Sequence, residues 1–235
     1  LQDAKIIFYI DDRFETFLHR ALETIPSAVQ KISIIQRADI ATLDSRRGGA
    51  WDEDEHEAHH EDKLYPDFHI WLDADNAKKI VKVIVRELSA IYPENKSTYK
   101  KNAEELLKRI NELDERLKNE LANVKNKPFI VFHDAYQYFE RRYGLMAVGS
   151  ITLEPNEPPS ANRVTEMRNK IKQTGASCVF REPYFSDRLV QTVIEGSEVK
   201  SEMLDPEATA LEPGKDLYFT LLENLGASIS KCLQN

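Results

Sequence analysis

The fold of this chain is organised around the stretch Asn95–Val124, which reads NKSTYKKNAEELLKRINELDERLKNELANV. Apolar residues recur in it at steps of three or four, the spacing of one helix face: Tyr99, Ala103, Leu106, Ile110, Leu113, Leu117, Leu121 and Val124. The stretch contains no Pro or Gly, and a helix of this length would be roughly 45 Å long. That exceeds the width of a small domain, so we expect residues 94–125 to form one rigid helix that joins two lobes.

Composition excludes several classes of protein. A length of 235 residues allows one or two domains with sizeable cores. The formal net charge of −8 supplies no basic face for phosphates, which argues against nucleic-acid binding and fits a cationic ligand. The sequence has no apolar run of spanning length, no glycine-rich phosphate loop and no G-x-S-x-G elbow. A membrane span, a nucleotide cofactor and serine-hydrolase chemistry are therefore not predicted.

The first part of the chain predicts a small, incomplete α/β lobe. Short apolar runs predict strands over Lys5–Ile10 and Ile32–Ile35. Asp11 and Asp12 are expected to cap a helix over Arg13–Thr24. Two strands make a poor sheet by themselves, so this lobe is expected to lack strands.

A second helix is predicted just before the long one. Ala74–Ile91 has a buried stripe at helical spacing, with Asp73 as its N-cap and Pro93 after its end.

After the long helix, strands and helices alternate regularly, which predicts a parallel sheet with helices on both faces. The expected strands are Phe129–Phe132, Met146–Leu153, Cys178–Phe180 and Val199–Leu204, and the expected helices are Ala135–Tyr143, Ser160–Thr174, Ser186–Ile194 and Asp216–Leu233. The predicted organisation is an α/β protein with a partial N-terminal lobe in 1–93, the bridging helix in 94–125 and a complete (β/α)4 lobe in 126–235.

Three residues are candidates for a metal site. His133 and Asp205 each follow a predicted strand, at the edge where parallel sheets bind ligands. His69 lies between Asp67 and the second predicted helix. Imidazoles with a carboxylate suit Zn²⁺, and the neighbouring Asp67 and Asp134 could orient the two rings by accepting hydrogen bonds from them. Each histidine could equally be an ordinary packing residue.

Two further features allow alternative interpretations. The tract Asp52–Asp62 is almost entirely Asp, Glu and His; His56, His59 and His60 could hold metal weakly, or the tract could be a solvated acidic linker. Cys178 and Cys232 could be buried thiols, or a disulfide of an oxidising compartment.

Several motifs together resemble one known family. They are F-H-I-W-L-D at Phe68–Asp73, F-H-D-A-Y-x-Y-F at Phe132–Phe139 and L-D-P at Leu204–Pro206, together with the acidic His tract. In this order, and over essentially the whole chain, they are similar to the zinc-binding proteins of high-affinity bacterial zinc uptake (ZnuA type). These are periplasmic solute-binding components of ABC importers, in which one long helix bridges two (β/α)4 lobes.

The resemblance implies a set of roles. His69 and His133 would ligate Zn²⁺ in the cleft between the lobes, with Asp205 as an alternative ligand and His56, His59 and His60 gathering metal. The Cys178 and Cys232 positions match a disulfide of Gram-negative members. A further metal-binding His and about two βα units would lie ahead of Leu1. With that His missing, Asp205, water or a residue of the acidic tract is expected to complete the coordination.

The implied partners are a zinc ion and an ABC permease, for a periplasmic monomer that is not an enzyme. The alternative in the same class is a manganese- or iron-binding relative, which would favour a carboxylate in place of His133. A zinc hydrolase would need an open ligand position and a general base. The H-E-x-x-H spacing occurs at His56–His60, but it lies in the acidic tract, where no helix is predicted to carry it, so the hydrolase is not the favoured interpretation. An adhesin is a third alternative, because relatives of this fold have been given that role.

Overall fold

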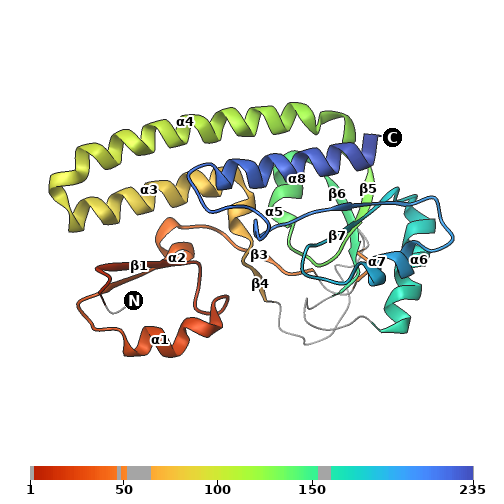
Figure 1. Cartoon of the computed structure of the whole chain (residues 1–235), viewed down its shortest axis with the longest axis horizontal. Coiled ribbons are helices and arrows are strands. Elements are labelled where there is room, and N and C mark those ends of the chain that lie inside the picture. The colour runs from red at the N-terminus through yellow and green to blue at the C-terminus, as the bar shows by residue number, and fades with distance from the viewer. Residues whose placement is uncertain (1–2, 47–48, 52–64, 153–159, 235) are drawn as a thin grey trace. The chain divides into compact units, whose positions relative to one another are not determined.

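The computed structural model describes residues 3–46, 49–51, 65–152 and 160–234. Its contacts divide the chain into two compact units (Figure 1). The first unit comprises Leu1–Leu43 and Pro66–Glu112, and the second comprises Asp44–Tyr65 and Leu113–Asn235. In the part of the chain that is described, no helix has both the length and the apolar character needed to cross a membrane.

The first unit contains a parallel pair of strands, β1 (Ile6–Tyr9) and β2 (Gln30–Ser33). A 3₁₀ turn, η1 (Thr16–Leu18), and a short helix, α1 (His19–Thr24), connect them. The apolar residues between these elements form a small core made of Ile7, Ile25 and Val29. β1 confirms the first predicted strand.

The predicted helix over Arg13–Thr24 is wrong in its first part, because α1 begins only at His19. Asp11 does not cap a helix there. Its carboxylate accepts hydrogen bonds from the backbone N–H and the guanidinium of Arg13. The carboxylate of Glu15 in turn accepts from the backbone N–H groups of Ile10 and Asp11. These local bonds satisfy the backbone in a tight turn, which competes with helix formation.

The second predicted strand is shifted. β2 ends at Ser33, and the next residues form helix α2 (Ile34–Ala38), so the prediction over Ile32–Ile35 is correct only for its first half. Ile34 and Ile35 are both buried. A short apolar run satisfies burial equally well in a strand or in a helix, which is why periodicity misplaced this boundary.

Two-residue strands, β3 (Leu43–Asp44) and β4 (Pro66–Asp67), pair with each other and lead to a 3₁₀ turn, η3 (Ile70–Leu72). Helix α3 (Ala74–Ile91) follows. The carboxylate of Asp73 accepts a hydrogen bond of 2.7 Å from the backbone N–H of Asp75, which confirms Asp73 as the N-cap. A 3₁₀ turn, η4 (Pro93–Asn95), ends this segment.

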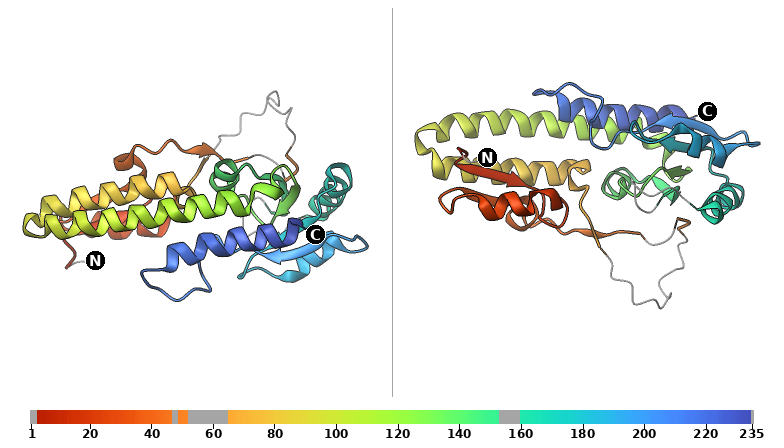
Figure 2. Two further views of the ribbon diagram at one scale, coloured as in Figure 1. Left: turned by 90° about the horizontal axis from the view of Figure 1, so that it is seen from above. Right: turned by 60° about the horizontal axis from the view of Figure 1, so that its bottom comes forward.

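The long helix predicted from the sequence is present as α4 (Lys96–Glu120), followed by a 3₁₀ turn, η5 (Ala122–Val124) (Figures 1 and 2). Its apolar stripe is half-buried at Tyr99, Ala103 and Leu106. From Ile110 onward every member of the stripe is buried. The spacing therefore predicted both the helix and the face that it buries.

The second unit contains a four-stranded parallel sheet in the order β6-β5-β7-β8. The strands are β5 (Pro128–Val131), β6 (Met146–Ser150), β7 (Cys178–Arg181) and β8 (Lys200–Met203), and the helices that alternate with them are α5 (Gln137–Tyr143), α6 (Ala161–Thr174), α7 (Asp187–Ile194) and α8 (Leu217–Gln234). This confirms the predicted (β/α)4 alternation. The hydroxyls of Ser160 and Ser186 cap α6 and α7 as N-caps, while Gly144 and Gly175 end α5 and α6 in the left-handed conformation.

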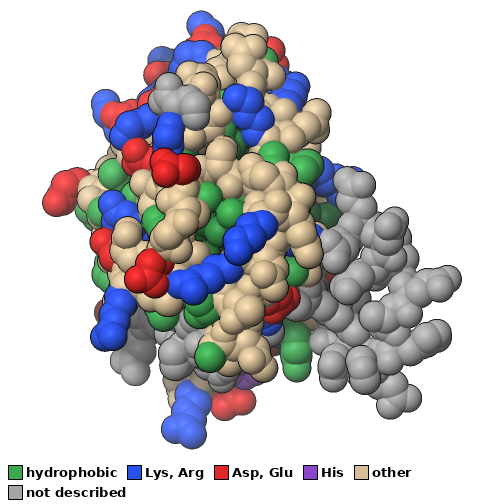
Figure 3. Space-filling view, turned by 90° about the vertical axis from the view of Figure 1, so that its right-hand side faces the viewer, with side chains coloured by type: hydrophobic (Ala, Val, Ile, Leu, Met, Phe, Trp, Pro, Cys, Tyr) green, Lys and Arg blue, Asp and Glu red, His purple; other side chains and the backbone are tan. Residues whose placement is uncertain are grey.

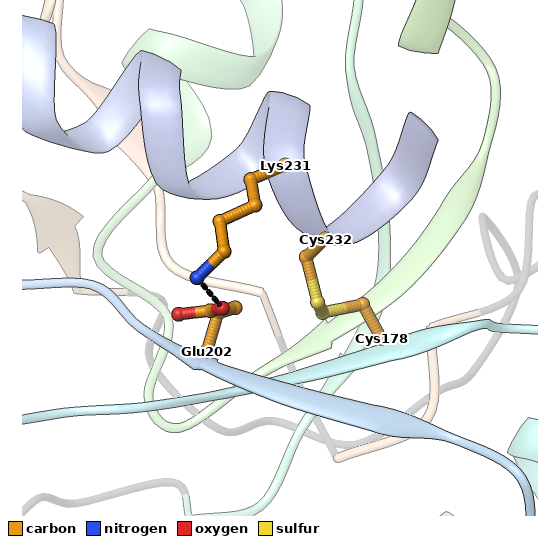
Figure 4. The surroundings of a disulfide bond; sticks show 4 residues. All are labelled: Cys178, Glu202, Lys231 and Cys232. Carbon is orange, nitrogen blue, oxygen red and sulfur yellow. Dashed lines mark ion pairs between the residues drawn. A yellow bond between two sulfur atoms is a disulfide. The ribbon is translucent and has the colours of Figure 1, made fainter. Parts of the chain in front are cut away.

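Helices cover both faces of this sheet. Val179 points into an apolar core that also contains Ile130 of β5 and Phe132, which directly follows β5. Residues of α6 and α7 complete this core. Cys178 is its neighbour in β7 and points to the opposite face, because side chains alternate along a strand. There it forms the expected disulfide with Cys232 of α8 (Figure 4).

On the face drawn in Figure 3, Lys and Arg side chains are interspersed with Asp and Glu.

Candidate metal centre

His133 lies just beyond β5, at the carboxyl edge of the sheet in the second unit. β5 pairs with β7 so that Phe129 is opposite Cys178, and continuing this register places His133 opposite Glu182. His133 Nδ1 is 2.8 Å from each carboxylate oxygen of Glu182. The hydroxyl of Tyr136 donates a further hydrogen bond of 3.1 Å to Glu182 Oε1. The sheet therefore brings together residues that are far apart in the sequence.

Glu182 dominates the electrostatics around His133. Burial alone would lower the pKa of the His133 imidazole. The hydrogen bond and charge of Glu182, together with the charges of Asp134 and Glu207, outweigh burial, and the pKa is raised. Burial and the neighbouring Glu182 raise the pKa of Tyr136 well above its usual value, so this phenol stays a hydrogen-bond donor. With Nδ1 held by a carboxylate, Nε2 is the nitrogen through which such an imidazole ligates zinc.

The sequence did not identify Glu182 as a site residue. Asp134 was the candidate to orient His133, but in the structure Glu182 contacts the imidazole Nδ1 and Arg46 binds Asp134. A signal was present, since Glu182 closely follows the predicted strand Cys178–Phe180, just as Asp205 follows Val199–Leu204. The rule that selected His133 and Asp205 would have selected Glu182 as well.

Asp205 follows β8 and shares a cavity of about 80 Å³ with His133, Glu182 and Glu207. His133 and Asp205, which the sequence placed at the ligand-binding edge of the sheet, therefore line one cavity of the second unit. The Asp205 carboxylate also holds its own loop. It accepts hydrogen bonds of 3.0 Å from the Thr209 hydroxyl and from the backbone N–H of Ala210.

His69 lies between β4 and η3 in the first unit, and Asp67 orients it as expected. Its Nδ1 is 2.7 Å from Asp67 Oδ1, and its backbone N–H donates to the same oxygen at 2.9 Å. The ring packs near Trp71 and Phe14, with centroids 5.3 Å and 6.1 Å away. Asp67 is buried. His69 and His133 thus share one local arrangement, in which a buried carboxylate holds Nδ1.

Asp134, the neighbour of His133, is bound by Arg46. The Arg46 guanidinium contacts both Asp134 oxygens and also the carboxylate of Glu140, at 2.8 and 2.9 Å. Burial alone would lower the pKa of Arg46, but the charges of Glu140 and Asp134 raise it. The guanidinium carbon of Arg46 also lies 3.5 Å from the centre of the Trp51 ring.

His56, His59 and His60 lie outside the described residues. Within the ranges that are described, no three His, Cys, Asp or Glu side chains come close enough together to hold a metal ion. What each unit presents is one histidine whose Nδ1 is held by a buried carboxylate.

Comparison with known proteins identifies the family. The family model for ZnuA, the periplasmic component A of a zinc-uptake complex, matches residues 1–232. The chain is 36% identical to the high-affinity zinc uptake system protein ZnuA of Brucella abortus over 260 residues, covering 99% of this chain and 78% of that protein. The chain belongs to the ZnuA family. The ZnuA protein of Paracoccus denitrificans is 40% identical over 168 residues, covering 71% of this chain and 52% of the relative.

The fold agrees with that assignment. A crystal structure of ZnuA superposes with a TM-score of 0.81 at 24% identity, covering 99% of this chain and 81% of the other. Members of the ZnuA family are zinc-binding components of ABC importers and not enzymes. The predictions of family, fold class and non-enzymatic zinc uptake are therefore confirmed, and the hydrolase alternative is excluded.

Proposed function

We propose that this protein captures Zn²⁺ in the periplasm, with His69 and His133 as two ligands of one ion, and delivers it as a monomer to an ABC permease. Asp205 is the proposed further ligand. The acidic tract with His56, His59 and His60 is proposed to gather metal for this site.

One observation carries the assignment of the histidines. His69 and His133 each present Nδ1 to a carboxylate that is itself only 4% exposed, Asp67 and Glu182 respectively. This carboxylate–histidine arrangement fixes the tautomer and the orientation of a ring that ligates zinc through its other nitrogen. Removing two carboxylates from water is costly unless each has a strong partner, and the imidazoles supply one here.

The donor types favour zinc over a harder ion. Two imidazole nitrogens suit Zn²⁺, whereas manganese sites favour carboxylate and water oxygens. Asp205 adds one carboxylate, and its hydrogen bonds to Thr209 and Ala210 hold it at the cavity that it shares with His133. The manganese-binding alternative would be favoured by a carboxylate at position 133, and this chain has His there.

A competitive chelator titration of the metal-free protein tests the proposal. His69→Ala and His133→Ala are each expected to weaken Zn²⁺ binding by more than the roughly 10- to 100-fold typical of losing an outer partner. His19→Ala is the matched control, because His19 is an exposed histidine of the first unit and should leave the affinity unchanged.

The stoichiometry completes the test. A variant lacking residues 52–62 should keep one tight site per chain if the two histidines share an ion. Tight binding that survives His133→Ala, or that disappears only with the acidic tract, would refute the ligand assignment. An affinity for Mn²⁺ equal to that for Zn²⁺ would favour the manganese-binding alternative.

A further inference from the structure

We propose that Arg46 is a positioning residue for zinc binding, which acts by clamping Asp134 and with it the backbone that carries His133. The inference rests on the proposed function, since it takes His133 as a zinc ligand. Arg46 precedes His133 by more than 80 residues, so it belongs to none of the motifs that mark the site.

The contact between Arg46 and Asp134 is extensive. The backbone N–H of Arg46 donates to Asp134 Oδ2 at 3.0 Å, and Nε and Nη2 donate to Oδ1 at 3.0 and 2.5 Å. Because Arg46 engages both carboxylate oxygens, these charge-assisted bonds fix the direction of the Asp134 carboxylate as well as its position. Asp134 directly follows His133 and is largely buried, so its fixed side chain restrains the adjoining backbone.

The clamp also decides which carboxylate is available to His133. Asp134 and Glu182 are both candidates to accept from Nδ1, and the structure assigns that bond to Glu182. Arg46 engages both oxygens of Asp134 with a charge of opposite sign. The two carboxylates therefore have different roles: Glu182 holds the His133 ring, and Asp134 holds the main chain next to His133.

Arg46 is itself held by its surroundings. Its guanidinium lies over the Trp51 ring and bonds the buried Glu140 in addition to Asp134. The chain beyond it docks along β6, where Gly49 O accepts from the backbone N–H of Ser150 at 2.7 Å and Trp51 N–H donates to Val148 O at 3.0 Å. The described residues Arg46 and 49–51, here named the docking segment, are therefore anchored on the same sheet as His133.

One glycine permits this docking. A Cβ added at Gly149 would lie 2.3 Å from Gly49 O, far inside contact distance. Gly149→Ala should therefore loosen the docking segment without removing any charge. It provides a second way to weaken the clamp, independent of the substitution of Arg46.

The test compares two arginine clamps in the same unit. Arg142 also binds an aspartate through charge-assisted hydrogen bonds, from Nε to Asp114 Oδ1 at 2.8 Å and from Nη2 to Asp114 Oδ2 at 2.5 Å. Neither Arg142 nor Asp114 lines the cavity at His133. Arg46→Gln is expected to weaken Zn²⁺ binding roughly 10- to 100-fold in the chelator titration, with partial rescue by Arg46→Lys. Arg142→Gln should reduce resistance to urea but leave Zn²⁺ affinity unchanged.

A spectroscopic readout separates positioning from stability. The visible absorption of bound Co²⁺, which reports ligand geometry, should change in Arg46→Gln and Gly149→Ala and stay as in the wild type in Arg142→Gln. Should Arg46→Gln fail to fold, Asp134→Asn and Gly149→Ala carry the same expectation. Unchanged Zn²⁺ affinity and Co²⁺ spectrum in these variants would overturn the inference.

His133→Ala distinguishes the two levels of the argument. If it keeps tight Zn²⁺ binding, the proposed function fails and the positioning role fails with it. If His133→Ala loses Zn²⁺ binding while the variants of the clamp keep it, only the role of Arg46 is refuted. An equal loss of affinity in Arg46→Gln and Arg142→Gln would assign both arginines a merely structural role.

Discussion

Breaking the disulfide should remove a large part of the stability of the second unit. Cys178 and Cys232 are both buried, and their bond ties β7 to the last turns of α8 (Figure 4). A neighbouring ion pair between Lys231 and Glu202 also links α8 to the sheet, but the Lys231 side chain is 70% exposed, so this pair contributes little. The covalent link therefore adds to the other contacts near the end of α8, which include buried Ile229 and Leu233 and a hydrogen bond of 2.8 Å from Lys127 Nζ to Leu233 O.

The magnitude follows from the length of chain that the bond closes. The two cysteines are 54 residues apart in sequence. For a loop of that size, the loss of chain entropy in the unfolded state stabilises the folded state by about 4 kcal/mol. A small domain is stable by only about 5–15 kcal/mol in total, so reduction should shift the urea midpoint strongly.

The assay is urea unfolding with and without a thiol reductant. The chain has two tryptophans, Trp51 in the second unit and Trp71 in the first. In a Trp71→Phe background, Trp51 fluorescence reports the second unit alone. Reduction should lower its unfolding free energy by about 4 kcal/mol, which for a slope near 2 kcal/mol per molar urea moves the midpoint by roughly 2 M.

A double variant, Cys178→Ala with Cys232→Ala, is the control. It should be about as unstable as the reduced protein and should not respond to reductant. A change in unfolding free energy of less than about 1 kcal/mol on reduction would refute the reasoning. It would mean that closing this loop does not stabilise the folded state by the amount that its length predicts. A double variant as stable as the oxidised wild type would refute it equally.

Three further predictions concern the site and its supports. Glu182→Gln and Asp67→Asn should each weaken Zn²⁺ binding roughly 10- to 100-fold in the chelator titration by releasing an imidazole, and unchanged affinity would show that these carboxylates do not orient the ligands. Burial alone would raise the pKa of Asp114, but Arg142 and Lys118 outweigh it and lower the pKa from 3.8 to about 2. The stability that the ionised Asp114 carboxylate contributes is therefore present above the unfolded pKa and is lost as the pH falls from about 4 to 2. After allowance for solvent screening, this contribution is about 1–2 kcal/mol. In urea unfolding, the difference in stability between the wild type and Asp114→Asn should therefore shrink by that amount over this pH range. Ala208→Gly should raise the melting temperature slightly, because Ala208 has φ +57° and a left-handed conformation costs a residue with a Cβ roughly 1–2 kcal/mol; a lowered melting temperature would contradict this.

Local rules accounted for much of the fold. Apolar runs predicted the strands of the second unit, and helical spacing predicted the long α4. This works because the spacing of buried residues is set by the geometry of the helix or strand itself. Polar caps and glycines set helix ends, as at Ser160, Ser186 and Gly144. In the first unit the same rules misplaced α1 and β2. Hydrogen bonds to the side chains of Asp11 and Glu15 replace the expected first turns of the α1 helix. The end of β2 was misplaced because its apolar run fits a strand and a helix equally well.

The sequence by itself determined the elements, the candidate histidines and the family. Asp67 could also be inferred, because it lies two residues from His69 and the contact is local. The partner of His133 was decided only by the tertiary structure. The strand order β6-β5-β7-β8 places β7 beside β5 and so brings Glu182 to His133. Arg46 binds Asp134, although the two residues are 88 positions apart in the sequence. Neither contact follows from local spacing, because pairing between distant strands depends on the packing of the whole sheet.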